Sequence, residues 1–86
     1  MNILELKNIE KEEGFIYYFR KYTAIATLQL PTEITDTPIS FSIETGPLGN
    51  RNIEVELKKQ PNYPALPIIS ALKRMILTND QQGLIP

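Results

Sequence analysis

An alternation of apolar and polar residues in the middle of the chain constrains its fold more than any other feature. Every second residue is apolar in "PISFSIE" (residues 38–44) and again in "NIEVELK" (residues 52–58), so each segment has one apolar face when it is extended. The link between them, "TGPLGNR" (residues 45–51), has two glycines, a proline and an asparagine, which favour the backbone conformations of a tight turn. The pattern predicts an antiparallel β-hairpin.

The segment upstream of this hairpin is also predicted to be extended. In "TAIATLQLP" (residues 23–31) the small and aliphatic residues fall on one side, and Pro31 ends the strand because proline has no N–H to donate. Residues 15–30 are therefore expected to form one long strand or two shorter ones. The stretch that follows, "PTEITDTP" (residues 31–38), is bracketed by prolines and is expected to be a surface loop.

The first residues allow two interpretations. The segment "ILELKNI" (residues 3–9) fits a strand with Leu4 and Leu6 facing inward, followed by a turn in which Gly14 adopts a positive φ. The charged stretch "KNIEKEE" (residues 7–13) fits the start of a short helix equally well.

After residue 64 the apolar spacing changes to that of an amphipathic helix. Pro64 and Pro67 are compatible with its first turn, where the N–H groups have no partner within the helix. Asn79 or Gly83 could end the helix. The apolar positions, at i, i+3, i+4 and i+7 spacing, are Ala65, Ile68, Ile69, Leu72, Met75 and Ile76, and Ser70, Lys73 and Arg74 lie opposite.

These elements predict a single α+β domain over residues 1–86. Its fold would be a four-stranded antiparallel meander sheet (β-β-β-β-α) with one C-terminal amphipathic helix packed on one face. One helix is roughly 10 Å across, whereas a four-stranded sheet is about 15 Å wide. Either the sheet curls strongly around the helix, or a second copy of the chain covers the rest of the apolar face.

The composition excludes several classes of chemistry. The chain has no cysteine and no histidine, so disulfides, thiolate or imidazole metal sites and histidine-dependent catalysis are excluded. The clustered carboxylates Glu10, Glu12 and Glu13 lack the spacing of a calcium-binding loop. We therefore expect a protein that is not an enzyme, with no catalytic residues, no metal and no cofactor.

Charge and hydropathy limit the partners. Nine Lys and Arg residues against ten Asp and Glu residues give a formal net charge of −1, and the pI is about 5.3. Nucleic acid is therefore disfavoured as a partner, because proteins that bind it normally carry a basic excess. The N-terminal residues are charged early, and no apolar run approaches the ~18 residues of a membrane span. We expect a cytoplasmic protein with no membrane partner.

The segment "GFIYYFRKY" (residues 14–22) holds five of the seven aromatic residues of the chain. If it belongs to one unbroken strand, three aromatic side chains form an exposed row, which suits an interface with another protein chain. Those side chains are Phe15, Tyr17 and Phe19, and the rings on the buried side are Tyr18 and Tyr22.

A bulge or turn near "RKYT" (residues 20–23) would reverse the two faces. The exposed row would then alternate aromatic and basic residues, as in proteins that stack single-stranded bases on rings at about 1–3 kcal/mol per base. This row is Tyr18, Arg20 and Tyr22, with Lys21, Lys58 and Lys59 available for phosphates. A third interpretation is that all five rings fill the sheet, because aromatic residues are enriched in strands.

The element order β-β-β-β-α is similar to that of the whirly and Pur-type single-stranded nucleic-acid binders, which pack a helix on a curled sheet and dimerise. The resemblance lies in topology alone, and a fold does not imply a function. Glutamates on the outer face of the predicted hairpin would repel phosphates. We therefore favour a small non-enzymatic protein-binding module that self-associates through its sheet, as a homodimer or other homo-oligomer, over a single-stranded nucleic-acid binder.

Overall fold

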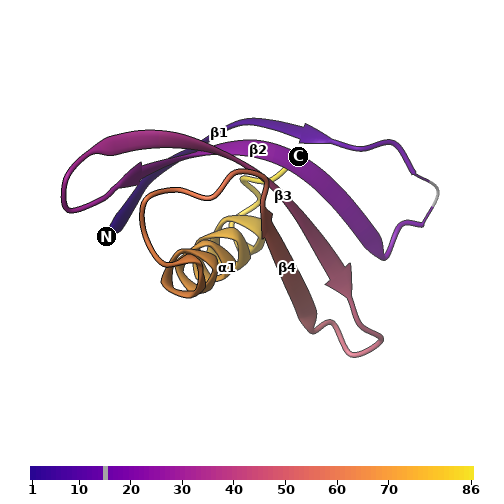
Figure 1. Ribbon diagram of the computed structural model, residues 1–86. Coiled ribbons are helices and arrows are strands. Elements are labelled where there is room, and N and C mark those ends of the chain that lie inside the picture. The colour runs from indigo at the N-terminus through magenta and orange to yellow at the C-terminus, as the bar shows by residue number, and fades with distance from the viewer. Residues whose placement is uncertain (15) are drawn as a thin grey trace.

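Four antiparallel strands followed by one helix make up the structure, a computed structural model that describes residues 1–14 and 16–86 (Figure 1). The elements are β1 (Asn2–Lys11), β2 (Phe19–Gln29), β3 (Ile34–Thr45), β4 (Arg51–Leu57) and α1 (Ala65–Gln81). Each strand pairs with the next one along the chain, in the order β1-β2-β3-β4. The predicted fold class, an antiparallel meander of four strands followed by a C-terminal helix, is confirmed.

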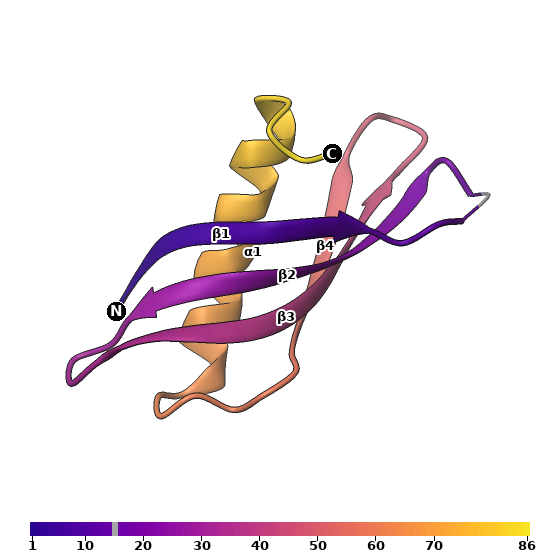
Figure 2. The same cartoon turned by 90° about the horizontal axis from the view of Figure 1, so that it is seen from above.

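The sheet is strongly curved and arches over α1 (Figure 1). Seen from above, β1, β2 and β3 cross over the helix, whereas β4 runs beside it (Figure 2). The helix packs against β4. This curvature brings the wider sheet around the narrower helix, so curling of the sheet, the first of the two alternatives, covers the apolar face within one chain.

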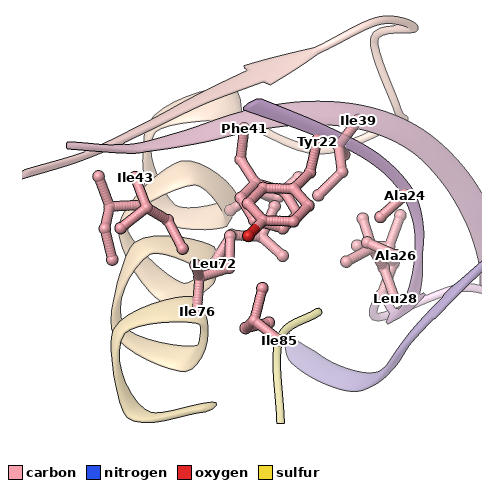
Figure 3. Close-up of a cluster of buried hydrophobic side chains, with 13 residues drawn as sticks. Tyr22, Ala24, Ala26, Leu28, Ile39, Phe41, Ile43, Leu72, Ile76 and Ile85 are labelled. Atoms are coloured by element: carbon pink, nitrogen blue, oxygen red, sulfur yellow. The ribbon is translucent and has the colours of Figure 1, made fainter. Parts of the chain in front are cut away.

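One hydrophobic cluster fills the space between the sheet and the helix (Figure 3). The ring of Tyr22 stacks on that of Phe41, with centroids 4.9 Å apart and planes at 19°. Burial of apolar area at about 25 cal/mol per Å² makes this cluster the main source of stability. Its buried members are Tyr22, Ala24, Ala26, Leu28, Leu30, Ile39, Phe41, Ile43, Ile53, Ile68, Leu72, Ile76 and Ile85.

The β3–β4 hairpin matches its prediction. Ile43 lies opposite Ile53, and the apolar residues of both strands face α1. Gly49 has a φ of 84°, a conformation that glycine adopts without strain, and Gly46 N–H donates to the Asn50 carbonyl at 2.7 Å. The glycines therefore form the turn that the sequence predicts.

The interpretation of the first residues was partly wrong. β1 is a strand up to Lys11, so the alternative short helix is not formed. Leu4 is exposed rather than inward, because register shifts against β2 fall between Ile3 and Glu5 and between Lys7 and Glu10. Each shift adds a residue and moves the next side chain to the other face. The residue with a positive φ in this region is Asn8 (55°), not Gly14.

The predicted surface loop over residues 31–38 was also wrong at its C-terminal half, since β3 already begins at Ile34. Pro38 lies within this strand, at the position where the ladder with β4 ends. Its carbonyl accepts a hydrogen bond from Lys58 N–H at 3.0 Å, and the missing proline N–H removes only the reciprocal bond. A proline at the end of a ladder is therefore compatible with the strand.

Helix α1 begins and ends as its sequence predicts. Pro64 occupies the N-cap position and Pro67 lies in the first turn. At the other end Gly83 has a φ of 75°, its N–H donates to the Asp80 carbonyl at 3.1 Å, and Leu84 N–H donates to the Asn79 carbonyl at 2.8 Å. This pair of bonds is a Schellman motif, which turns the chain back toward the sheet.

Candidate functional site

A charged cluster joins three elements at one end of the core. The Asp80 carboxylate of α1, only 5% exposed, accepts hydrogen bonds from Arg20 of β2 at 3.1 and 2.9 Å and from Arg51 Nε of β4 at 2.7 Å. Arg20 also donates to the Tyr22 hydroxyl at 3.2 Å, and that hydroxyl donates to the Pro86 carbonyl at 2.8 Å. The cluster therefore ties the helix and the tail to the sheet.

Electrostatics explain why this buried carboxylate stays ionised. Burial acts to raise the pKa of Asp80, but the hydrogen bonds and positive charges of Arg20 and Arg51 outweigh it and hold the pKa below its ordinary value. The hydrogen bond to Asp80 in turn raises the pKa of Arg20. The polar groups of the cluster are engaged with one another, so we assign it a structural role.

The sequence reasoning missed Asp80 and Arg51 in this cluster. A usable signal was present, because the alternation in β2 places Arg20 on the same face as Tyr22. An arginine on a buried face requires a counter-charge.

The aromatic segment lies mostly outside the sheet. β2 begins only at Phe19, so Tyr17 and Tyr18 belong to the connection between β1 and β2, and Phe15 lies outside the described residues. Tyr17 is 92% exposed, and Tyr18 and Phe19 are partly exposed. Tyr18 was expected to be buried on an unbroken strand, and this expectation was wrong because the strand starts after it.

The reversed arrangement of faces is also wrong. Tyr22 is fully buried against Phe41, and Arg20 is bound to Asp80 on the inner face. Neither side chain presents a free surface on which a base could stack. The row of Tyr18, Arg20 and Tyr22 is therefore not formed.

The proposed phosphate contacts are separated from one another. Lys21 lies on the outer face of the sheet beside Glu54 and Glu56, and Lys58 lines a different hollow that includes Glu10. Lys59 is exposed in the connection that follows β4. Each of the first two lysines thus has acidic neighbours, and the structure does not bring the three together.

An apolar surface forms where the β1–β2 connection and the β3–β4 turn project from the same end of the sheet (Figure 2). Tyr17 and Tyr18 pack edge to face, with centroids 6.0 Å apart, and Thr45 N–H donates to the Tyr18 carbonyl at 2.8 Å. A cavity of about 460 Å³ lies between the two segments, lined by Tyr17, Tyr18, Glu44, Thr45, Gly46 and Pro47. We name this surface the apolar tip and define it as Ile16, Tyr17, Tyr18, Phe19, Pro47 and Leu48.

Exposure makes the apolar tip distinctive. Leu48 is 95% exposed and Tyr17 is 92% exposed, and Ile16 is about half exposed. Large apolar side chains that gather in an exposed patch usually mark an interaction surface. Tyr17 and Phe19 of the sequence prediction belong to this surface, whereas Leu48 was not predicted because it was assigned only to a turn.

Two other classes of site are not found in residues 1–14 and 16–86. Over this part of the chain, no group of three acidic or imidazole side chains is placed to hold a metal ion. No helix in the same residues has the length and hydropathy to cross a membrane.

Comparison with known proteins identifies a family. The model of the BB_0187 family matches residues 1–81, which include every strand and the whole of α1. The chain belongs to this family. No curated protein and no solved structure matches it. Its function is therefore argued from its own surface.

Proposed function

We propose that this protein is a non-enzymatic binding module that associates with a second copy of itself through the apolar tip. The observation that carries this proposal is the concentration of exposed apolar side chains at one end of the sheet, above all Tyr17 and Leu48. The rest of the apolar face is covered by α1, so the tip rather than the sheet as a whole supplies the contact. Buried aromatic anchors commonly dominate the energy of such interfaces.

The charges beside the apolar tip favour a second copy as the occupant. On the outer face Phe19 lies directly opposite Glu44, and Lys21 lies two residues further along β2. No ion pair in the described part of the chain uses Glu44 or Lys21. A two-fold axis through the tip would place Lys21 of each copy near Glu44 of the other.

Two other functions receive less support. Glu44 and the two tyrosines are the only titratable groups among the described residues that line the tip cavity, which gives no convergent set for catalysis. Stacking of single-stranded bases loses its main candidate because the ring of Tyr22 lies inside the core.

Sedimentation velocity over a wide range of protein concentration tests the proposal. The wild-type chain is expected to shift toward a dimer as its concentration rises. Tyr17→Ser and Leu48→Ser are each expected to weaken association by about tenfold, since truncation of a central apolar anchor costs more than about 1 kcal/mol. Leu66→Ser is the matched control, because Leu66 is 77% exposed but lies in the first turn of α1.

A charge exchange tests the two-fold arrangement. Lys21→Glu is expected to weaken the dimer, and the double variant Lys21→Glu with Glu44→Lys is expected to restore it. A wild-type chain that stays monomeric at every concentration would overturn the proposal. So would an equal loss of association in Leu66→Ser.

A further inference from the structure

A second surface, distinct from the apolar tip, lies between β4 and α1. A cleft of about 280 Å³ is lined by Arg51, Asn52 and Ile53 of the strand and by Lys73, Arg74 and Leu77 of the helix. We name it the basic cleft. Three of its six lining residues are cationic and none is acidic, although the whole chain carries a net negative charge. The cleft therefore concentrates positive charge on an otherwise acidic protein.

The cations of the cleft retain binding capacity. Arg51 bonds to Asp80 through Nε, and among the described residues its terminal nitrogens have no hydrogen-bond partner. Arg74 is exposed and takes part in no ion pair of the described residues. Lys73 is engaged only by Glu54, at 3.8 Å, where both side chains are substantially exposed. An exposed pair of this kind is worth little and is easily exchanged.

The floor of the basic cleft selects between two classes of anionic partner. Ile53 and Leu77 provide aliphatic contact, and no aromatic side chain lines the described cleft. Single-stranded nucleic acid relies on aromatic rings for stacking, which this cleft does not offer. A peptide with both carboxylates and aliphatic side chains fits the lining better.

We propose that the basic cleft binds an acidic segment of a partner polypeptide. Carboxylates of this segment would pair with Arg51, Lys73 and Arg74, and one of its aliphatic side chains would cover Ile53 and Leu77. Glu54 then acts as an internal competitor, because it occupies Lys73 in the free protein. Binding of the partner exchanges this intramolecular pair for an intermolecular one.

Fluorescence anisotropy with a labelled peptide of alternating Glu and Leu tests the proposal. The peptide is expected to bind, and its affinity is expected to fall as salt is added because the contacts are charged. Lys73→Gln and Arg74→Gln are each expected to weaken binding by about two- to fivefold, and Glu54→Gln is expected to strengthen it by a similar factor. Arg51 is left unchanged because it also supports Asp80.

Matched controls separate the basic cleft from other surfaces. Lys59→Gln changes the net charge equally but lies outside the cleft, and it is expected to leave binding unchanged. Tyr17→Ser is also expected to have no effect, so failure here is distinguishable from failure of self-association. The proposal is overturned if the peptide does not bind at low salt, or if a peptide with Gln in place of Glu binds equally well. Tighter binding of single-stranded oligo-dT, or an equal loss in Lys59→Gln, would also overturn it.

Discussion

At the scale of single residues, Asp80 supports more of the structure than any other polar side chain described. It is almost completely buried, and it accepts hydrogen bonds from two arginines that precede it by 60 and 29 positions. Its removal would leave two guanidinium groups without their counter-charge. A polar contact of this kind is costly to break from one side.

Asp80→Asn is expected to lower the free energy of unfolding by about 2–3 kcal/mol, because it keeps the size of the side chain but removes the charge. Urea denaturation of the two proteins measures the change. Asp36→Asn is the control, since the pair of Asp36 with Lys7 is exposed, and its denaturation midpoint is expected to remain close to that of the wild type. Equal midpoints for Asp80→Asn and the wild type would contradict the structural role of the cluster.

The same carboxylate predicts how stability depends on pH. The folded-state pKa of Asp80 lies below its ordinary value of 3.8, so its stabilising contribution is fully present above that value and is lost as the pH falls through the folded-state pKa. The difference in unfolding free energy between wild type and Asp80→Asn is therefore expected to shrink as the pH falls below about 3.8. Denaturation curves of both proteins at a series of acidic pH values measure it.

Subtraction of the variant is needed because a second carboxyl titrates in the same direction. The hydrogen bonds from Lys7 and Thr27 lower the pKa of Asp36, and this group is present in both proteins. A difference between wild type and Asp80→Asn that stays constant through the acidic range would contradict the assignment.

At the scale of elements, alternation and periodicity predicted most of the structure. The β3–β4 hairpin and α1 were found as expected, because their patterns are regular and their turns contain the required glycines and prolines. The course of β1 could not be predicted, since its two register shifts depend on pairing with β2 and leave no mark in a single sequence. Pro38 misled the interpretation because its place at the end of a ladder is a property of the sheet.

Gly83 ends α1 in a conformation that other residues adopt with strain. A methyl group added at this position would contact nothing within 4 Å, so the strain comes from the φ of 75° alone. Gly83→Ala is expected to destabilise the fold by about 1 kcal/mol, as measured by thermal or urea denaturation. Gly14→Ala is the control, because Gly14 has equally open surroundings without a positive φ. Equal effects at both positions would contradict the Schellman motif as the cause.

At the scale of the whole molecule, the candidate site was only partly predictable. Exposure of Tyr17 and Phe19 followed from the clustering of rings in the sequence. Their neighbours Pro47 and Leu48 come from a turn that is distant along the chain, and only the curvature of the sheet brings the two segments to one end (Figure 2). The basic cleft was missed for the same reason, because it combines residues of β4 and α1.

The connection of β2 to the last residues has a consequence for synthesis. Arg20 and Tyr22 find their partners Asp80 and Pro86 at separations of 60 and 64 residues. A chain emerging from the ribosome can pair its strands one after another, but the concave side stays bare until the helix has been translated. During that interval the growing polypeptide depends on solubility rather than on packing, and chaperones would meet it as an open arch.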